Sequence, residues 1–570
     1  LDVSVSIYDQ LFRFMESFTT SNKNIKHIVS NPNVSLNSLA FVGSAVTTLK
    51  LKALQMENYN LPRTNNLLSR EFYDCFEKSV PEGTSMIQSQ EDSIQTQLNK
   101  SNVHIMEKDT LITVDATPVD ESTDNYKCQV STEGTHMTDD AKVWRELYDS
   151  HIEPLNLPTV SYETLITNQK NQNNFNNSKE KADHVEIVTF GTGSALPSKY
   201  RNVISTLVKV PYIDESNNIS QRNILFDAGE NTIGQIKRNF SENKQQDIFK
   251  DLKMIYLSHL HADHHLGIIS ILREWYQYNK SDPDARIYLV SPWQYNKFVK
   301  EWLLLESPEI LLRINYISCE HLINERVCRM ETKPINVDEY VDLMNDEFGE
   351  NESNSDGESA GELRSLKRRR LELNNMSSFR NIKMIRSMYE DLHIQRFQTC
   401  RAIHCNWAYS NSITFQVSNT KTFKVSYSGD TRPNIDNFAK DVGQNSDLLI
   451  HEATLDNELQ EDAIKKKHCT INEAITVSNK MNAQKLLLTH FSQRYPKVPN
   501  IMNNVEIKAK EYCFAFDGMI VDYEKMGEQL AILPKLGNLF VEEAEEEIEK
   551  ENVQLREHDD HKQSKKKSKK

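Results

Sequence analysis

The chain has 570 residues, a formal net charge of −15 and 38% apolar residues. At about 150 residues per domain, this length predicts more than one domain. The sequence contains no run of about 18 apolar residues, so it predicts no transmembrane helix. The eight cysteines are widely spaced and form no Cys-x-x-Cys pair, which is typical of a reducing intracellular compartment and not of a disulfide scaffold. Because the first residue is Leu1, we expect a fragment from which any targeting peptide is missing.

The negative charge is concentrated in two stretches. Residues 338–362 contain ten acidic and no basic residues, and residues 542–551 contain seven acidic residues and one lysine. Together they carry −16, which leaves about +1 for the rest of the chain, so an anionic substrate is not excluded. Such charge runs predict disordered segments. The basic runs at 367–370 and 562–570 predict either nuclear-localisation or phosphate-attracting patches, or simply flexible charged segments.

Residues 1–140 carry no ligand-type spacing. Helix and strand patterns are mixed over 1–140, with a helix expected at 39–55 and a strand at 111–114. Residues 168–183 (NQKNQNNFNNSKEKAD) are polar and aperiodic, which predicts a linker.

From residue 184 onward, short apolar runs end in polar clusters. Buried strands are expected at 185–190, 223–227, 252–258, 286–291, 423–430, 447–453 and 485–490. Helical patterns follow several of them, as at 266–278. This alternation predicts a layered α/β domain, with the acidic stretch as an insertion within it.

The segment Ser258-His-Leu-His-Ala-Asp-His-His265 lies directly after an expected strand. It offers His259, His261, Asp263 and His264 within six residues. Imidazole nitrogen and carboxylate oxygen are the ligands that zinc takes. A plain surface loop is the alternative, but these groups would be costly to bury without a ligand.

Three further candidates, His404, Asp430 and His490, follow expected strands. Taken singly, each also fits a capped turn or a hydrogen-bonded core histidine. Taken together, they complete two coordination shells, and two ions about 3.5–4 Å apart suit in-line attack on a phosphodiester. Asp430 is the expected bridge, because it is the only remaining carboxylate of the set.

The order His-x-His-x-Asp-His, then His, Asp and His, resembles that of the metallo-β-lactamase superfamily. Four local motifs narrow the resemblance to tRNase Z, the family of tRNA 3′-end processing endoribonucleases. They are Pro197-x-Lys199-x-Arg201-Asn202, His404-Cys405-x-x-Ala408-Tyr409, His451-Glu452-Ala453-Thr454 and His468-Cys469-Thr470. The match spans about 184–535. The sequence departs from the family pattern at Cys469, where the family has Ser, and at Asn231 and Ser410.

The resemblance implies a four-layer αβ/βα metallo-β-lactamase sandwich in the long eukaryotic form. Residues 1–167 are then the end of a degenerate copy of the same fold, and 168–183 are the linker. Residues 184–535 form the catalytic domain, with the acidic insertion at about 338–378, and residues 536–570 form a charged disordered tail. The implied protein is monomeric, and its N-terminal half acts as an internal pseudo-dimer partner.

The resemblance also implies two zinc ions and their ligands. The first ion is held by His259, His261, His404 and Asp430, and the second by Asp263, His264, Asp430 and His490. The catalytic residues are Asp263, which orients the attacking water, His468, which protonates the leaving oxygen, and Glu452, which orients His468. A strand-end carboxylate paired with a lysine is the alternative for Glu452.

The expected substrate-binding residues are Lys199, Arg201, Asn202 and Thr470, with an exposed basic loop as the alternative for the first two. Asp227 ends a strand beside the site and is expected to hold a histidine ligand. His265 is expected to be structural, because both shells are already full.

The function implied is removal of the 3′ trailer from precursor tRNA after the discriminator nucleotide, in the nucleus and mitochondrion, with no membrane partner. One rival is another hydrolase of the superfamily, a thioesterase or messenger-RNA endonuclease, which would lack the Pro-x-Lys-x-Arg-Asn and His-Glu-Ala-Thr motifs. The second is a non-catalytic RNA-binding or scaffold subunit, which would lack ligands.

Overall fold

The computed structural model describes residues 17, 27–29, 42–62, 103–105, 110–120, 123–132, 140–155, 160–175, 181–198, 200–323, 380–493, 506–532 and 534–536. The expected acidic insertion, the charged tail and Lys199 lie outside the described residues. The chain forms two compact units, each described by itself. The first comprises Leu1–Val46 and Pro62–Leu157, and the second comprises Thr47–Leu61 and Pro158–Lys570.

The described residues of the first unit form two small sheets. Strands β1 (His27–Val29) and β2 (Val103–Ile105) pair in parallel, while β3 (Thr110–Asp120) and β4 (Thr123–Thr132) form an antiparallel hairpin. The strand expected at 111–114 lies within β3. Helix α5 (Asp140–His151) follows. The descent of this unit from a degenerate copy of the catalytic fold stays a prediction.

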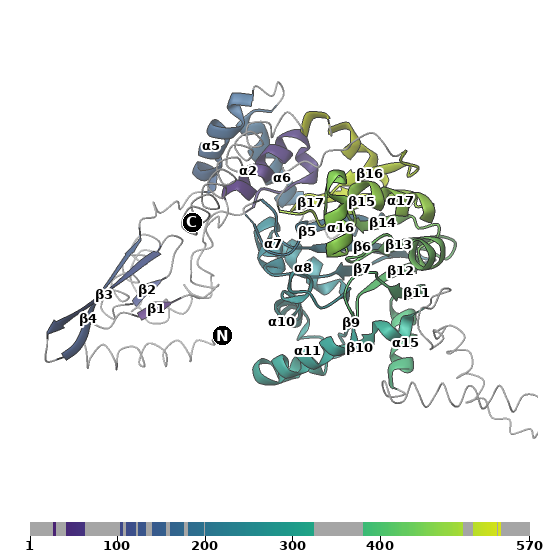
Figure 1. Cartoon of the computed structure of the whole chain (residues 1–570), viewed down its shortest axis with the longest axis horizontal. Helices are drawn as coiled ribbons and strands as arrows, with labels where there is room; N and C mark the ends of the chain where they lie inside the picture. Colours follow the sequence, from purple (N-terminus) through teal and green to yellow (C-terminus); the bar gives the residue numbers. More distant parts are fainter. Residues whose placement is uncertain are drawn as a thin grey trace, which may run out of the picture. The chain divides into compact units, whose positions relative to one another are not determined.

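The second unit is built on two mixed sheets (Figure 1). The first sheet has the order β10-β9-β8-β7-β6-β5-β17, and β7 to β10 run parallel. Its strands are β5 (Glu186–Gly191), β6 (Ser205–Ile213), β7 (Ile219–Phe226), β8 (Leu252–Tyr256), β9 (Ile287–Ser291), β10 (Ile314–Ser318) and β17 (Met519–Asp522).

The second sheet has the order β11-β12-β13-β14-β15-β16, and β13 to β16 run parallel. Its strands are β11 (Ile394–Arg401), β12 (Tyr409–Gln416), β13 (Thr422–Tyr427), β14 (Leu448–Glu452), β15 (Lys485–Thr489) and β16 (Glu511–Phe514). All seven strands expected from residue 184 onward are present, to within a few residues at their ends.

Helices cover the outer face of each sheet. The first sheet carries α7 (Thr232–Asn239), α8 (Glu242–Lys250), α10 (Ile268–Asn279) and α11 (Trp293–Glu306). The second carries α16 (Gln460–Lys466), α17 (Ile471–Met481) and the π-helical η4 (Ile435–Val442). Helix α10 shows why these helices form here: it is amphipathic, and its apolar face of Ile268, Ile271, Leu272 and Trp275 is buried in the core shared with the sheet.

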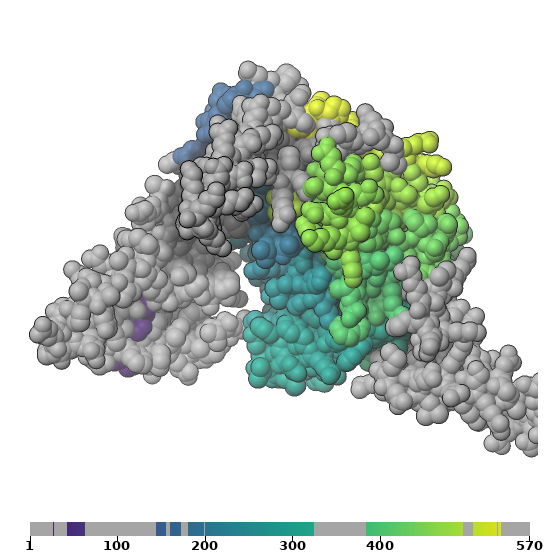
Figure 2. Space-filling model, in the orientation of Figure 1, coloured from purple at the N-terminus to yellow at the C-terminus, as the bar shows by residue number. Residues whose placement is uncertain are grey.

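The inner faces of the two sheets meet through aromatic side chains. The ring centroids of Phe226 and Tyr427 lie 5.3 Å apart, and those of Tyr256 and Phe397 lie 6.1 Å apart. The buried guanidinium of Arg222 on β7 donates to backbone oxygens that include those of Leu392 and Gln416 beside the second sheet. In the space-filling view, residues 200–323, blue to teal, pack against residues 380–493, drawn in green (Figure 2). The four-layer αβ/βα arrangement expected from the sequence is therefore confirmed.

The expected linker at 168–183 begins inside a helix. Helix α6 (Tyr162–Phe175) covers its first eight residues, and the Asn- and Gln-rich sequence is helical because tertiary contacts hold it. The ammonium of buried Lys52, on α2 (Val42–Leu54), lies within 2.9 Å of Asn168 Oδ1 and Gln172 Oε1. Among the residues that the structure describes, no helix is long and apolar enough to cross a membrane.

Lys52 also joins the segment after α2 to this helix. Its Nζ donates to the carbonyl oxygens of Met56 and Tyr59 at 2.9 and 2.8 Å. Tyr59 in turn bridges to Met519 on β17, so this N-terminal segment extends the edge of the first sheet. Burial lowers the pKa of Lys52 to about 8.

We predict that Lys52→Met weakens this junction. The substitution keeps the apolar stem but leaves four oxygens without their shared donor, at a cost of about 1–3 kcal/mol for a buried unsatisfied group. Amide hydrogen exchange should show lost protection in α6 and at Tyr59, whereas Lys170→Met, at an exposed position of the same helix, should change nothing. Equal protection in both variants would contradict the claim that Lys52 holds α6 to the segment around Tyr59.

Candidate metal centre

The seven predicted ligands lie together at one edge of the sandwich. His259, His261, Asp263 and His264 follow β8, the last two on the short helix α9 (Ala262–His265). The other three follow β11, β13 and β15, and are His404, Asp430 and His490. Parallel strands end at the same edge of a sheet, which is why residues far apart in sequence meet here.

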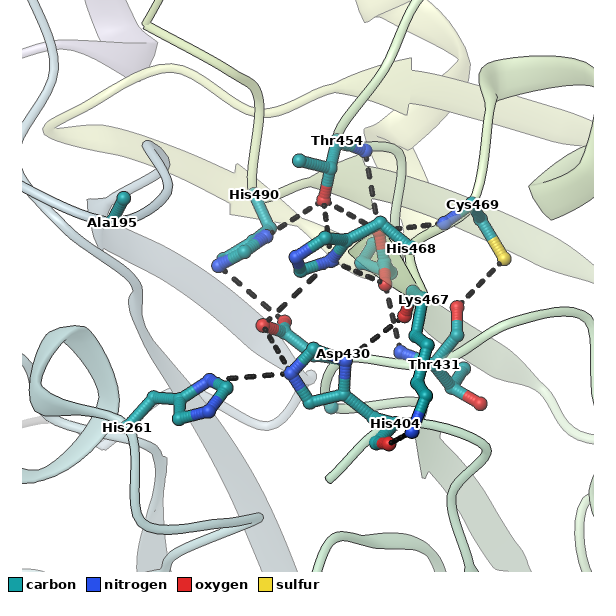
Figure 3. A network of polar contacts seen from close by, with 12 residues as sticks. Ala195, His261, His404, Asp430, Thr431, Thr454, Lys467, His468, Cys469 and His490 are labelled. Carbon is teal, nitrogen blue, oxygen red and sulfur yellow. Dashed lines mark hydrogen bonds and ion pairs between the residues drawn. The ribbon is translucent and has the colours of Figure 1, made fainter. Parts of the chain in front are cut away.

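The ligand atoms form two neighbouring groups around Asp430. One group contains His259, His261, His404 and Cys405, and the other contains Asp263, His264 and His490, with the ligand atoms of each group within 4.8 Å of one another. Asp430 Oδ2 lies 3.6 Å from His259 Nε2, 3.3 Å from His264 Nε2 and 3.8 Å from His404 Nε2. Its Oδ1 lies 3.4 Å from His490 Nε2 (Figure 3). Asp430 thus lies within 3.3–3.8 Å of histidine nitrogens from both groups.

A buried carboxylate, Asp227, fixes the ring of His264. The Nδ1 atom of His264 lies 2.7 Å from Asp227 Oδ2, which confirms the expected contact. Ser258 donates its hydroxyl to the same oxygen and therefore accepts from Nδ1 of His259 at 3.0 Å. Both rings thus carry their proton on Nδ1 and direct the lone pair of Nε2 inward.

Two further histidines are fixed in the same way. Nδ1 of His404 donates to the carbonyl of Lys467 at 2.9 Å. The hydroxyl of Thr454 has one proton, which it donates to the Glu452 carboxylate, so it accepts from Nδ1 of His490 at 2.9 Å (Figure 3). Thr454 lies in the His-Glu-Ala-Thr motif, but the sequence alone assigned it no role.

The inward atoms fit a metal ion. Among the described residues, Nε2 of His259, His264 and His490 and Oδ1 of Asp430 are buried and have no hydrogen-bond partner. Buried polar atoms normally have a partner, and four such atoms gathered around the Asp430 carboxylate fit a cation-binding site. Imidazole nitrogens with carboxylate oxygens form the donor set typical of zinc and other first-row metals.

His468 lies beside this cluster and contacts Glu452. Nδ1 of His468 is 3.1 Å from Glu452 Oε1 and 3.9 Å from Asp430 Oδ2. Burial alone lowers the pKa of His468, but the Glu452 carboxylate outweighs it and raises the pKa to about 9. Glu452 is buried and also accepts from the backbone N–H groups of Thr431 and Cys469, which hold it in place without a lysine.

The loop that carries His468 is fixed by a helix cap. Thr470, expected to bind substrate, is buried and forms a capping box with Glu473 at the start of α17. Arg432 forms an ion pair with Glu473 and donates to the carbonyl of His468. Cys469 donates its thiol to the carbonyl of Thr431 at 3.0 Å. The side chain of Thr470 therefore caps α17 and supports the loop, and its predicted contact with substrate stays a prediction.

Arg201 and Asn202, also expected to bind substrate, lie inside the protein. The Arg201 guanidinium lies over the rings of Phe491 and Phe516, at 4.8 and 5.0 Å from their centroids, and donates to the carbonyl of Ala515. The Asn202 amide donates to the carbonyl of Glu230 at 3.0 Å. Both residues are under 8% exposed, so their side chains support the loop from within.

Asp517 anchors the same loop and was missed in the sequence, because it lies in no recognised motif. It accepts from the backbone N–H of Asn202 and, at 2.7 Å, from the hydroxyl of Thr192. Burial raises the pKa of Asp517 to about 6. Cys405 was also given no role, although its thiol lies among the ligand atoms of the first group. His265 lies outside all of these groups and packs against Tyr295, as expected.

The chain is similar to known ribonucleases. It is 55% identical to "Ribonuclease Z" of Saccharomyces cerevisiae over 95% of this chain and 62% of that protein. It is 37% identical to "Ribonuclease Z 1" of Schizosaccharomyces pombe, over 59% of this chain and 34% of that protein. The human protein "Zinc phosphodiesterase ELAC protein 2" is 31% identical over 69% of this chain and 40% of its own length.

The chain is also similar to a solved structure. The crystal structure of a long form RNase Z from yeast superimposes with a TM-score of 0.72 at 55% identity, over 90% of this chain and 64% of that one. No protein-family model matches the chain. The chain thus spans less than two thirds of the length of these relatives.

We predict that Thr454→Val weakens metal binding about 10–100-fold, the usual effect of removing a partner that orients a ligand. Valine has the same shape but offers no acceptor to Nδ1 of His490, so the proton is free to move to the ligand nitrogen. A chelator competition assay on the full chain measures the loss. Thr454→Ser should retain affinity, as should Thr476→Val on the exposed face of α17. An unchanged affinity in the Thr454→Val protein would show that the hydroxyl does not orient His490.

Proposed function

The chain belongs to the RNase Z family of metallo-β-lactamase-fold proteins, and on this premise we propose that it is an endoribonuclease that removes the 3′ trailer from precursor tRNA. The cut lies after the discriminator nucleotide and leaves a 3′-hydroxyl on the tRNA. The observation that carries the proposal is the set of inward, unpartnered ligand atoms around Asp430. A degenerate scaffold subunit would lack such a set.

The proposed cofactor is a pair of zinc ions. The donor set fits zinc, and the human relative is named a zinc phosphodiesterase. His259, His261 and His404 would hold one ion, Asp263, His264 and His490 the other, and Asp430 both. When bound, the ions would lower the pKa of a water molecule and polarise the phosphodiester.

Two side chains would orient the attacking water and protonate the leaving oxygen. Oδ2 of Asp263 accepts from the backbone N–H of Ala195 at 2.6 Å, which fixes the carboxylate that would orient the attacking water. His468 is held at Nδ1 by Glu452, so its Nε2 is available to donate a proton. The proton would go to the 3′-oxygen as its bond to phosphorus breaks, and the trailer would keep the 5′-phosphate.

The decisive experiment is cleavage of a precursor tRNA that carries a 3′ trailer by the full-length protein. The proposal requires one product that ends in the 3′-hydroxyl of the discriminator nucleotide and one that begins with a 5′-phosphate. Cleavage of an unstructured RNA at many sites would favour a general nuclease of the superfamily instead. The nuclear and mitochondrial location is likewise a proposal, which fluorescent tagging of the full-length protein would test.

We predict that Asp430→Ala loses bound metal and cleavage together while the fold is retained. The carboxylate is central to both ligand groups, and the sheets are packed independently of it. Metal content is measured by elemental mass spectrometry, and folding by circular dichroism. Asp436→Ala, at an exposed position on η4, should leave metal content and cleavage unchanged. A fully active Asp430→Ala protein would refute the two-ion site.

We predict that His468→Gln slows cleavage about 10²–10⁴-fold at saturating RNA and leaves affinity nearly unchanged, because a general acid acts on the leaving group. The defect should shrink on an RNA with sulfur in place of the bridging 3′-oxygen, since a thiolate leaves without a proton. Single-turnover rates on both substrates test this. If the variant loses affinity and keeps its rate, His468 is a binding residue and not the proton donor.

A further inference from the structure

We propose that Trp293 and Trp407 form a stacking platform for an unpaired nucleotide next to the scissile phosphodiester. This inference rests on the proposed function, because the platform would bind the single-stranded part of the same RNA. It assigns a specificity role to two residues outside the metal cluster and outside the motif positions that suggested the family.

Trp407 lies close to the metal centre. It belongs to the loop between β11 and β12 and follows the ligand His404 by three residues, which span at most about 11 Å of chain. A backbone hydrogen bond of 2.8 Å between Ala402 and Ala408 closes the loop. The next residue, Tyr409, donates its N–H to the carbonyl of Ser258, beside His259. The loop that carries the indole is therefore anchored to both sheets near the first group of ligands.

The two indoles are linked by one side chain. Trp293 begins α11, and the amide of the next residue, Gln294, lies between both rings. With its oxygen turned toward them, Gln294 accepts from Nε1 of Trp407 at 2.6 Å and from Nε1 of Trp293 at 2.9 Å. Both N–H groups are thus satisfied within the protein, so the rings need no further polar partner and can offer their faces.

The rings nevertheless remain open to solvent. Trp293 is 41% exposed and Trp407 47% exposed, although large aromatic side chains are normally mostly buried. Trp407 also has a backbone φ of 59°, in the left-handed region that a bulky residue adopts only at an energetic cost. An exposed indole on a strained backbone position, three residues from the predicted ligand His404, fits a binding role.

The chemistry of this surface fits RNA. Bases stack on indole faces whatever their identity, and a nearby cation binds the backbone. Nζ of Lys297, one turn along α11 from Trp293, lies 5.4 Å from the centre of that ring. The trailer beyond the acceptor stem is single-stranded, so its bases are free to stack. We therefore expect the platform to hold a nucleotide that flanks the cut.

The test compares Trp407→Leu with Trp407→Phe. Leucine removes the stacking face, and phenylalanine restores one. The matched control is Trp302→Leu, which removes an indole of similar exposure further along α11. Trp407→Leu should weaken precursor tRNA binding about 5–150-fold, as expected for the loss of one stacked base, while Trp407→Phe and Trp302→Leu stay near wild type.

Substrates with a single abasic site locate the nucleotide. At one position next to the cut, the losses of binding free energy caused by base removal and by Trp407→Leu should not be additive, because both changes delete the same contact. Quenching of tryptophan fluorescence by a short single-stranded RNA gives a readout without cleavage, so the platform can hold even if the trailer-cleavage proposal fails. Additive losses at every position would overturn the platform. So would an RNA-independent change in oligomeric state on Trp407→Leu, which would assign the surface to a second copy of the chain.

Discussion

The metal centre depends on where four imidazole rings carry their proton. A neutral histidine has one N–H and one lone pair, and only the lone pair can bind a metal ion. Five histidines are predicted ligands, and in four of them Nδ1 faces an acceptor inside the protein. The pairs are His264 with Asp227, His259 with Ser258, His404 with Lys467 and His490 with Thr454. The proton is thereby kept away from the site, and each Nε2 is left to bind metal.

These acceptors come from elements on both sides of the sandwich, so the fold and the chemistry are coupled. Asp227 follows β7 of the first sheet, yet it also accepts from the hydroxyl of Tyr427 on β13 of the second at 2.6 Å. Thr454 follows β14, and its hydroxyl contacts both the carboxylate that holds His468 and the ring of His490. A relative shift of the two sheets would therefore disturb ligand orientation on each of them. The interlocked aromatic rings between the sheets resist such a shift.

The sequence was most informative where chemistry and periodicity coincide. Apolar runs that end in His, Asp or Glu predict buried strands with functional ends, and those strands and ligands are found together here. The orienting contacts were harder to predict, because Thr454 and Ser258 are ordinary polar residues until the chain is folded. The helix over 162–175 was missed because its polar sequence lacks an apolar face, and only the distant Lys52 reveals why it is ordered.

The burial of Arg201 and Asn202 indicates a structural role for their side chains in the Pro-x-Lys-x-Arg-Asn loop. As a sequence it offers two cations and an amide to a polyanion, but Arg201 and Asn202 use their side chains to fix the loop between Phe491, Phe516 and Glu230. The fixed loop then contacts one residue of the second group and the chain neighbour of another. The backbone N–H of Ala195 holds the Asp263 carboxylate, and residues 192 and 194 pair with Phe491, the neighbour of His490. Within the described residues, the motif thus has an indirect role. The buried guanidinium of Arg201 holds the loop in place, and the backbone of the loop helps to position Asp263 and His490.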